Sequence, residues 1–128
     1  MQVEIQKADA ASGARVAAGQ DLSVRVPATS ANLGPGFDSL GLAVTLYDTV
    51  RVRTTDSDGI RVRVAGEGAA VLPTDETHLV ARTIVDTIRR AGYAAGGFEL
   101  ECENVIPHGR GLGSSASAIV SGVLAGNA

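Results

Sequence analysis

The segment Phe98-Glu-Leu-Glu-Cys-Glu-Asn-Val-Ile-Pro-His-Gly-Arg-Gly-Leu-Gly-Ser-Ser-Ala116 joins three kinds of sequence pattern. Its first six residues alternate between apolar and acidic, which is typical of a half-buried strand with its glutamates facing solvent. A glycine-rich loop follows, and small residues compatible with a helix then run from 115 to about 126. Strand, glycine-rich loop and helix, in this order, form the local context in which proteins hold phosphate groups.

Glycine and serine give this loop the chemistry of an anion site. Gly109, Gly111 and Gly113 let successive backbone N–H groups converge on an anion, and the following helix adds its positive end. Ser114 and Ser115 supply hydroxyls that can donate to phosphate oxygens or ligate a magnesium ion carried by a nucleotide. The loop matches neither G-x-x-x-x-G-K-[ST] nor G-x-G-x-x-G. An ordinary turn capped by Ser114 is the alternative interpretation.

A second unusual segment, Pro27-Ala-Thr-Ser-Ala-Asn-Leu-Gly-Pro-Gly-Phe-Asp38, places an amide and a carboxylate on stiff backbone. Asn32 can donate and accept hydrogen bonds, and Asp38 only accepts when it is ionised. The pair can therefore grip a small polar molecule that bears an amine or a hydroxyl. In the alternative, both side chains only satisfy neighbouring backbone N–H groups in a turn. Spacing alone leaves the two interpretations open.

The remaining patterns predict an α+β domain. Alternating apolar residues indicate strands over residues 22–26, 47–53 and 60–64, the first of which is stopped by Pro27. We expect the last two strands to pair as a hairpin with four arginines on a solvated face. Apolar residues at helical spacing predict a helix that begins at Leu79 and is stopped by Gly92. The expected fold is a twisted, mostly antiparallel sheet with helices packed on one side.

Composition and charge exclude several classes of protein. The formal net charge is −3, and the largest basic cluster is Arg89-Arg90, so no electrostatic footprint for nucleic acid or an anionic membrane is present. No stretch reaches the ~18 apolar residues of a membrane span, and the N-terminus lacks a signal-peptide pattern, so we expect a cytoplasmic protein. The single cysteine, Cys102, is expected to be a buried apolar residue rather than a nucleophile.

Two motifs together resemble the homoserine kinase family, within the superfamily of galacto-, homoserine, mevalonate and phosphomevalonate (GHMP) kinases. They are Val26-Pro-Ala-Thr-Ser-Ala-Asn-Leu-Gly-Pro-Gly-Phe-Asp-Ser-Leu-Gly-Leu-Ala43 and Ile106-Pro-His-Gly-Arg-Gly-Leu-Gly-Ser-Ser-Ala-Ser-Ala118. The later motif is shared across the superfamily. The earlier one is narrower, because galactokinases and mevalonate kinases carry a glycine-glutamate-histidine signature there, and cytidylyl-methylerythritol kinases a Pro-Ala-Lys start. The resemblance implies a ribosomal protein S5 domain 2-like fold, that of the GHMP kinase N-terminal domain.

The resemblance also implies an activity and a set of site residues. Family members use ATP and magnesium to phosphorylate the side-chain hydroxyl of L-homoserine, on the route to threonine. Asn32 and Asp38 match the positions that hold the amino-acid head of homoserine, with Asp38 paired to its ammonium. Ser115 is the implied magnesium ligand, and Ser114 an implied phosphate contact. The residues implied to cradle the ATP phosphates are Pro107, His108, Gly109, Arg110, Gly111, Leu112, Gly113, Ser114, Ser115, Ala116 and Ser117.

His78 departs from the family pattern. Residues 73–80 correspond to the part of the family that approaches adenosine, and many relatives have asparagine where this chain has His78. The departure puts that adenosine contact in doubt. We interpret His78 as a helix cap or a surface residue.

Length predicts that this chain is one part of a larger enzyme. Residues 1–20 form a poorly patterned lead-in with a possible first strand at 3–5, and residues 21–128 are expected to form the ATP-binding N-terminal domain, truncated at Ala128. The family is about twice this length, so a C-terminal domain is expected to be absent, together with a later glutamate of the magnesium site and later arginines and a threonine. The catalytic residues are thus unknown, and we expect these partners of the site to lie beyond Ala128.

Three further expectations concern how the chain behaves. We expect it to lack kinase activity by itself, while the intact parent protein is active, because phosphoryl transfer depends on a complete electrostatic clamp. Exposed apolar surface is expected to make it associate as a dimer or a larger species.

The alternative functions are another GHMP-type kinase, such as a mevalonate kinase, and a non-catalytic domain that binds phosphate or a partner chain.

Overall fold

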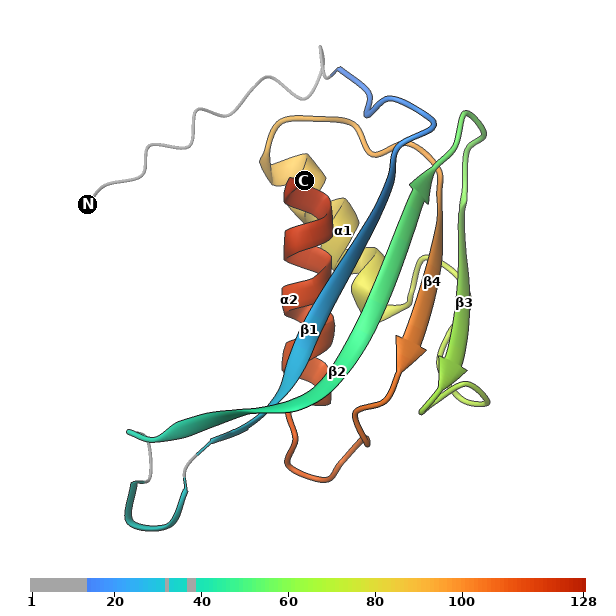
Figure 1. Cartoon of the computed structure of the whole chain (residues 1–128). Coiled ribbons are helices and arrows are strands. Elements are labelled where there is room, and N and C mark those ends of the chain that lie inside the picture. The colour runs from blue at the N-terminus through green and yellow to red at the C-terminus, as the bar shows by residue number, and fades with distance from the viewer. Residues whose placement is uncertain (1–13, 32, 37–38) are drawn as a thin grey trace, which may run out of the picture.

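A computed structural model describes residues 14–31, 33–36 and 39–128. In this part of the chain, a four-stranded sheet carries two helices on one face (Figure 1), which confirms the predicted α+β fold. The elements, in chain order, are β1 (Asp21–Ala31), the 3-10 turn η1 (Gly34–Gly36), β2 (Gly41–Thr54), β3 (Ile60–Gly66), α1 (Leu79–Arg90), β4 (Phe98–Asn104) and α2 (Ser114–Asn127). The possible strand at residues 3–5 lies outside the described residues.

The order of the strands differs from the expected hairpin. The sheet runs β1-β2-β4-β3, in which β4 pairs antiparallel with β2 and parallel with β3. The predicted pairing of β2 with β3 is wrong because β4 lies between them. This arrangement places Glu101 opposite both Arg51 and Arg63. Direct pairing of β2 with β3 would have set arginine against arginine, and like charges across a strand pair are destabilising.

Strand β1 continues beyond its predicted end. Its register with β2 shifts between Pro27 and Ala28, and pairing then resumes as far as Ala31. Proline is tolerated there because β1 is an edge strand with an irregular register, so the missing N–H breaks no regular ladder. Beyond this shift, β1 and β2 leave the sheet as a two-stranded ribbon (Figure 1).

The core lies between the sheet and the two helices. It is built from the inward residues of β2, β3 and β4 and the inner faces of α1 and α2. Its buried members are Val50, Val52, Val62, Val80, Ala81, Ile84, Ile88, Phe98, Leu100, Cys102 and Ala125. Cys102 is buried as predicted, and its burial raises the pKa of the thiol to about 12, so the sulfur stays protonated near neutral pH.

Two glycines set the distance between the helices. A β-carbon on Gly122 would lie 2.5 Å from the β-carbon of Thr83, and one on Gly126 would lie 2.7 Å from that of Thr87. Only glycine therefore permits α2 to approach α1 this closely. Helix α2 runs from Ser114 to Asn127, one residue longer at each end than the predicted 115–126.

Candidate functional site

The loop between β4 and α2 has the backbone of an anion site. Gly109, Gly111 and Gly113 have φ angles of 67°, 71° and 71°, a conformation that residues with a side chain rarely adopt. Gly113 occupies the N-cap position of α2 and provides no side-chain cap. Ser114 is instead the first residue of the helix, so a turn capped by Ser114 is not observed. The first N–H groups of α2 are left without helical partners and can meet a ligand.

Asp48 holds the beginning of this loop in place. It lies on the inward face of β2 and is only 6% exposed. Its Oδ1 accepts hydrogen bonds from the backbone N–H groups of Val105 and Ile106, at 2.7 and 2.9 Å. Hydrogen bonds to a charged acceptor are stronger than neutral ones. A strand in the middle of the sheet thus positions the loop that follows β4.

Thr29 connects the loop to the other unusual sequence segment. The backbone N–H of Thr29 donates to the carbonyl of Leu112 at 3.0 Å, and a β-carbon on Gly113 would overlap the Thr29 hydroxyl. The two segments that the sequence singled out therefore touch in the fold. Asn32 and Asp38 lie outside the described residues, and their contacts with a substrate stay a prediction.

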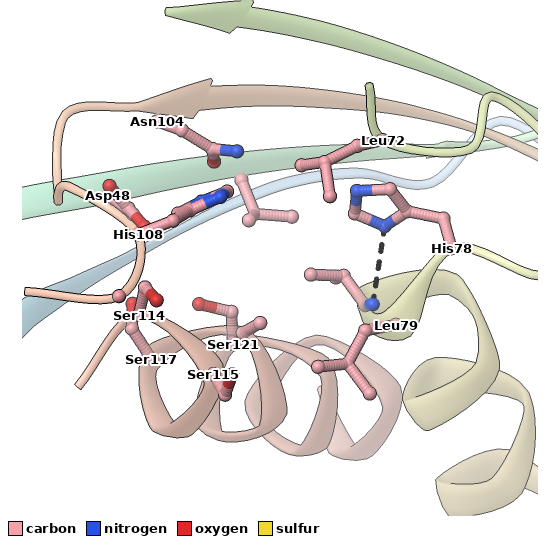
Figure 2. Close-up of a pocket in the computed structure, with 14 residues that line it drawn as sticks. Asp48, Leu72, His78, Leu79, Asn104, His108, Ser114, Ser115, Ser117 and Ser121 are labelled. Carbon is pink, nitrogen blue, oxygen red and sulfur yellow. Dashed lines mark hydrogen bonds between the residues drawn. The ribbon is translucent and has the colours of Figure 1, made fainter. Parts of the chain in front are cut away.

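A cavity of about 240 Å³ lies between the start of α2, the start of α1 and the inner face of the sheet (Figure 2). Its polar lining is Asp48, His78, Asn104, His108, Ser114, Ser115, Ser117 and Ser121, and its other lining residues are Val50, Leu72, Leu79, Val80, Gly109 and Ala118. Of the eleven loop residues predicted to cradle phosphate, His108, Gly109, Ser114, Ser115 and Ser117 line this cavity. The other six do not, namely Pro107, Arg110, Gly111, Leu112, Gly113 and Ala116.

Ala128 lies at the opposite end of α2 from this cavity. It is the C-cap of the helix, where its backbone N–H donates to the carbonyl of Leu124 at 3.1 Å. At about 1.5 Å per residue, the helix separates Ala128 from Ser115 by about 20 Å, and Ala128 does not line the cavity. The catalytic partners that we expect beyond Ala128 stay a prediction.

Three buried polar atoms of residues that line this cavity have no hydrogen-bond partner among the described residues. They are Nε2 of His78 and the hydroxyl oxygens of Ser117 and Ser121, on side chains of residues that are 4%, 3% and 0% exposed. A buried polar group without a partner costs about 1–3 kcal/mol, so most such groups in proteins are paired. Three of them around one cavity indicate a binding site for a polar ligand.

His78 contributes to both structure and site. It is the N-cap of α1, where its Nδ1 accepts a hydrogen bond from the backbone N–H of Val80 at 3.3 Å. Burial lowers the pKa of the imidazole below its ordinary value of 6.5, which favours the neutral ring. The prediction of a helix cap is confirmed, and the alternative of a surface residue is wrong.

Two residues of the cavity were not predicted from the sequence, although their positions in the sequence pattern could have indicated them. Asp48 precedes Val50 and Val52 at a spacing of two residues, so all three side chains face the core. A carboxylate at a core position is costly unless it has hydrogen-bond partners, and this marks Asp48 as a candidate for a structural or chemical role. Ser121 follows Ser117 by four residues, which places both hydroxyls on one face of α2.

Comparison with known proteins assigns the domain. Residues 78–128 match the family described as GHMP kinases N terminal domain. Residues 78–128 belong to a GHMP kinase N-terminal domain. Within this superfamily the chain is 57% identical, over 109 residues, to homoserine kinase from Rhodococcus erythropolis. That alignment covers 85% of this chain and 34% of the relative.

Solved structures agree with the assignment of this GHMP kinase domain. Homoserine kinase from Cytophaga hutchinsonii superposes with a TM-score of 0.72 at 37% identity, covering 84% of this chain and 34% of that one. Mevalonate kinase from Methanococcus jannaschii superposes with a TM-score of 0.68 at 19% identity, over 85% of this chain and 40% of that one, a likeness that shows the fold alone. The chain spans about a third of the length of the homoserine kinases it matches, so the expected twofold difference in length is too small.

The length and hydrophobicity of the helices show whether any of them could span a membrane. In the part of the chain that the structure describes, no helix is both long and apolar enough to cross a membrane.

Proposed function

We propose that the protein containing this chain is a homoserine kinase, which transfers the γ-phosphoryl group of ATP to the side-chain hydroxyl of L-homoserine. The product would be O-phospho-L-homoserine, an intermediate of threonine biosynthesis. The observation that carries the proposal is the uncapped start of α2 behind a loop with three left-handed glycines, opening on a cavity with unpartnered polar groups. The similarity to homoserine kinases supports the choice of substrate.

The phosphates of ATP would lie at the glycine-rich loop and the N-terminus of α2. The backbone N–H of Ser117 already donates to Gly113 at 2.8 Å, which leaves the N–H groups of Ser114, Ser115 and Ala116 for the phosphates. Ser117 would act through its side chain instead, because its hydroxyl lines the cavity. The first turn of α2 contains no acidic residue, so its positive end is not neutralised locally.

ATP would bring a magnesium ion to this site, and the ion would offset part of the negative charge of the phosphates. The exposed hydroxyl of Ser115, on the first turn of α2 and at the cavity, is the oxygen we propose as its ligand from this chain. No group of three His, Cys, Asp or Glu side chains that could hold a metal occurs among the described residues. A magnesium ion that keeps phosphate oxygens and waters as its other ligands suits such a site, because it needs few protein ligands.

Homoserine would bind beside the phosphates, held by Asn32 and Asp38. The contact between Thr29 and the glycine-rich loop supports this placement, because Thr29 belongs to the same sequence segment as Asn32. A substrate hydroxyl next to the γ-phosphate needs little beyond correct positioning and charge stabilisation for phosphoryl transfer.

Three further properties belong to the proposal. We place the protein in the cytoplasm, where amino-acid biosynthesis takes place. The 128-residue chain is expected to lack turnover, because it spans about a third of the homoserine kinases and the remaining catalytic groups would follow Ala128. Its exposed apolar surface is expected to make it self-associate.

A coupled assay of ADP release tests the proposed function. The intact protein that carries this chain should release ADP with L-homoserine and release none above background with mevalonate, while the 128-residue chain should be inactive with both. Turnover with mevalonate but not with homoserine would contradict the proposed substrate. Turnover by the 128-residue chain comparable to that of an intact relative would contradict the proposed incompleteness of the site.

A further inference from the structure

Thr29 is held rigidly beside the start of α2. It pairs with Ala43 of β2 within the two-stranded ribbon, beyond the register shift of β1. On the opposite edge of β1, its backbone N–H donates to the carbonyl of Leu112 at 3.0 Å. The preceding residue, Ala28, is fully buried. The backbone of Thr29 is therefore fixed on both edges of the strand.

The side chain of Thr29 places a hydroxyl against the N-cap of α2. A β-carbon on Gly113 would overlap this hydroxyl. Thr29 is exposed, and within the described part of the chain its hydroxyl makes no hydrogen bond. Packing alone does not require the hydroxyl, because valine has the same branched shape and is equally favourable in strands. Thr29 thus presents an unused donor on stiff backbone next to the helix end.

The start of α2 lies between Thr29 and the cavity. Ser114 and Ser115 line the cavity, whereas Thr29 contacts Gly113 and does not line it. Figure 1 shows the ribbon of β1 and β2 leaving the sheet close to the beginning of α2. The backbone N–H groups of residues 114–116 have no helical partner. They therefore lie at the helix end that the cavity and Thr29 share.

A polyphosphate bound across this helix end would bring its last phosphate toward Thr29. On the cavity side, the hydroxyl of Ser117 is unpartnered although the residue is only 3% exposed. This orphaned group independently indicates a polar ligand at the first turn of α2. A nucleotide that enters the cavity and follows the free N–H groups with its phosphates extends its terminal phosphate out of the cavity. Thr29 lies on the side that this phosphate reaches.

The proposed phosphoryl acceptor approaches from the same side. Asn32 and Asp38, which we propose to hold homoserine, follow Thr29 in one segment of the sequence. In the reaction, the side-chain oxygen of homoserine forms a bond to the γ-phosphorus of ATP. The bond from this phosphorus to the bridging oxygen breaks, its electron pair stays on ADP, and the hydroxyl proton of homoserine passes to water.

We propose that Thr29 is a catalytic residue, whose hydroxyl donates a hydrogen bond to a non-bridging oxygen of the phosphoryl group during its transfer. This inference rests on the proposed function. Thr29 forms no covalent bond and loses no proton. A donor on fixed backbone contributes to the rate when it meets the transferred group better in the transition state than in bound ATP.

Steady-state kinetics of the intact protein that carries this chain test the inference. We expect Thr29→Val to lower kcat with L-homoserine by about 10- to 100-fold, because one donor to the transferred group is lost. The KM values for ATP and for homoserine should change little, since the hydroxyl acts mainly in the transition state. Thr29→Ser keeps the hydroxyl and should retain most of the kcat.

A transition-state mimic supplies a second measurement. ADP with aluminium fluoride imitates the phosphoryl group in transfer, so with homoserine present it should bind to Thr29→Val more weakly than to the unmutated protein, by a factor similar to the loss of kcat. Calorimetric titration should show the same affinity for ATP in both proteins. A loss of affinity for ATP equal to that for the mimic would overturn the inference.

Two further variants separate the hydroxyl from folding and packing. Thr29→Ala removes the hydroxyl without adding a methyl group and should lose as much kcat as Thr29→Val, while circular dichroism verifies the fold of both. Thr49→Val removes a threonine hydroxyl from β2, at a position that alternates with Asp48 and Val50 and so faces away from the helices. Its kcat should equal that of the unmutated protein.

The outcomes distinguish this inference from the proposed function. If the unmutated protein phosphorylates homoserine and Thr29→Val retains its kcat, the role of Thr29 is overturned and the proposed function stands. An equal loss of kcat in Thr29→Ser and Thr29→Val, or a rise in KM alone, would also overturn that role, because it would indicate packing or substrate binding. If the unmutated protein does not phosphorylate homoserine, both proposals fail.

Discussion

Asp48 is the residue on which the position of the glycine-rich loop depends most directly. Replacing it with alanine removes the acceptor of the Val105 and Ile106 N–H groups, and the latter residue is fully buried. We expect Asp48→Ala to lower the free energy of unfolding by about 2 kcal/mol or more, since a buried donor loses its partner. Asp48→Asn keeps an oxygen acceptor and should cost less than half as much. Urea denaturation measures both, and equal stability of Asp48→Ala and the unmutated chain would contradict the anchoring role.

His78 predicts how stability changes with pH. Because burial lowers its pKa in the folded protein, the unfolded chain binds more protons at mildly acidic pH, and stability rises with pH. The contribution of His78 is present above its ordinary pKa of 6.5 and is lost as pH falls through that value toward the lower folded pKa. We expect the unmutated chain to lose more stability between pH 7 and pH 5 than His78→Ser does, as measured by urea denaturation at both values. An equal loss in the two proteins would contradict the assignment of a neutral, capping imidazole.

At the scale of elements, the close contact between α1 and α2 holds the two helices that line one side of the cavity. A methyl group on Gly122 would press against Thr83 and lie 3.1 Å from the carbonyl oxygen of Val80. We expect Gly122→Ala to destabilise the chain by about 1–3 kcal/mol, although alanine is the better helix former by about 1 kcal/mol, because a β-branched side chain and backbone cannot move away easily. Arg82→Ala, on the exposed face of α1, should change stability by about 0.5 kcal/mol or less. A melting temperature of Gly122→Ala equal to or above that of the original chain would contradict tight packing between α1 and α2 at Gly122.

At the scale of elements, local features of the fold could be predicted from the sequence, and the order of the strands could not. Helix α1 was predicted closely because its apolar spacing is local information, and the left-handed glycines follow from the loop composition. The place of β4 between β2 and β3 could not be read in this way, since strand order depends on which distant segments meet. The same reason explains why Asp48 was missed, since it reaches the cavity from β2, far in sequence from the glycine-rich motif.

For the whole molecule, the outer face of α2 determines how the isolated chain should behave. Ile119, Val120, Val123 and Leu124 are each 44–50% exposed on this helix. A contiguous apolar face of this kind promotes association. We expect the 128-residue chain to form dimers or larger species in light scattering, and Val123→Glu to shift it toward monomer, whereas Ser23→Glu on the opposite face of the sheet should not. A monodisperse monomer at high concentration would contradict this expectation.

The central claim is that the glycine-rich loop and the start of α2 hold the phosphates of a nucleotide. Backbone amide NMR during titration with ATP tests it most directly, because each N–H of the loop reports on its own contact. The account predicts that the largest shifts fall on residues 109–116 and that tripolyphosphate reproduces them. Saturating ATP that leaves these amides unmoved, or that shifts amides elsewhere on the molecule instead, would contradict the account.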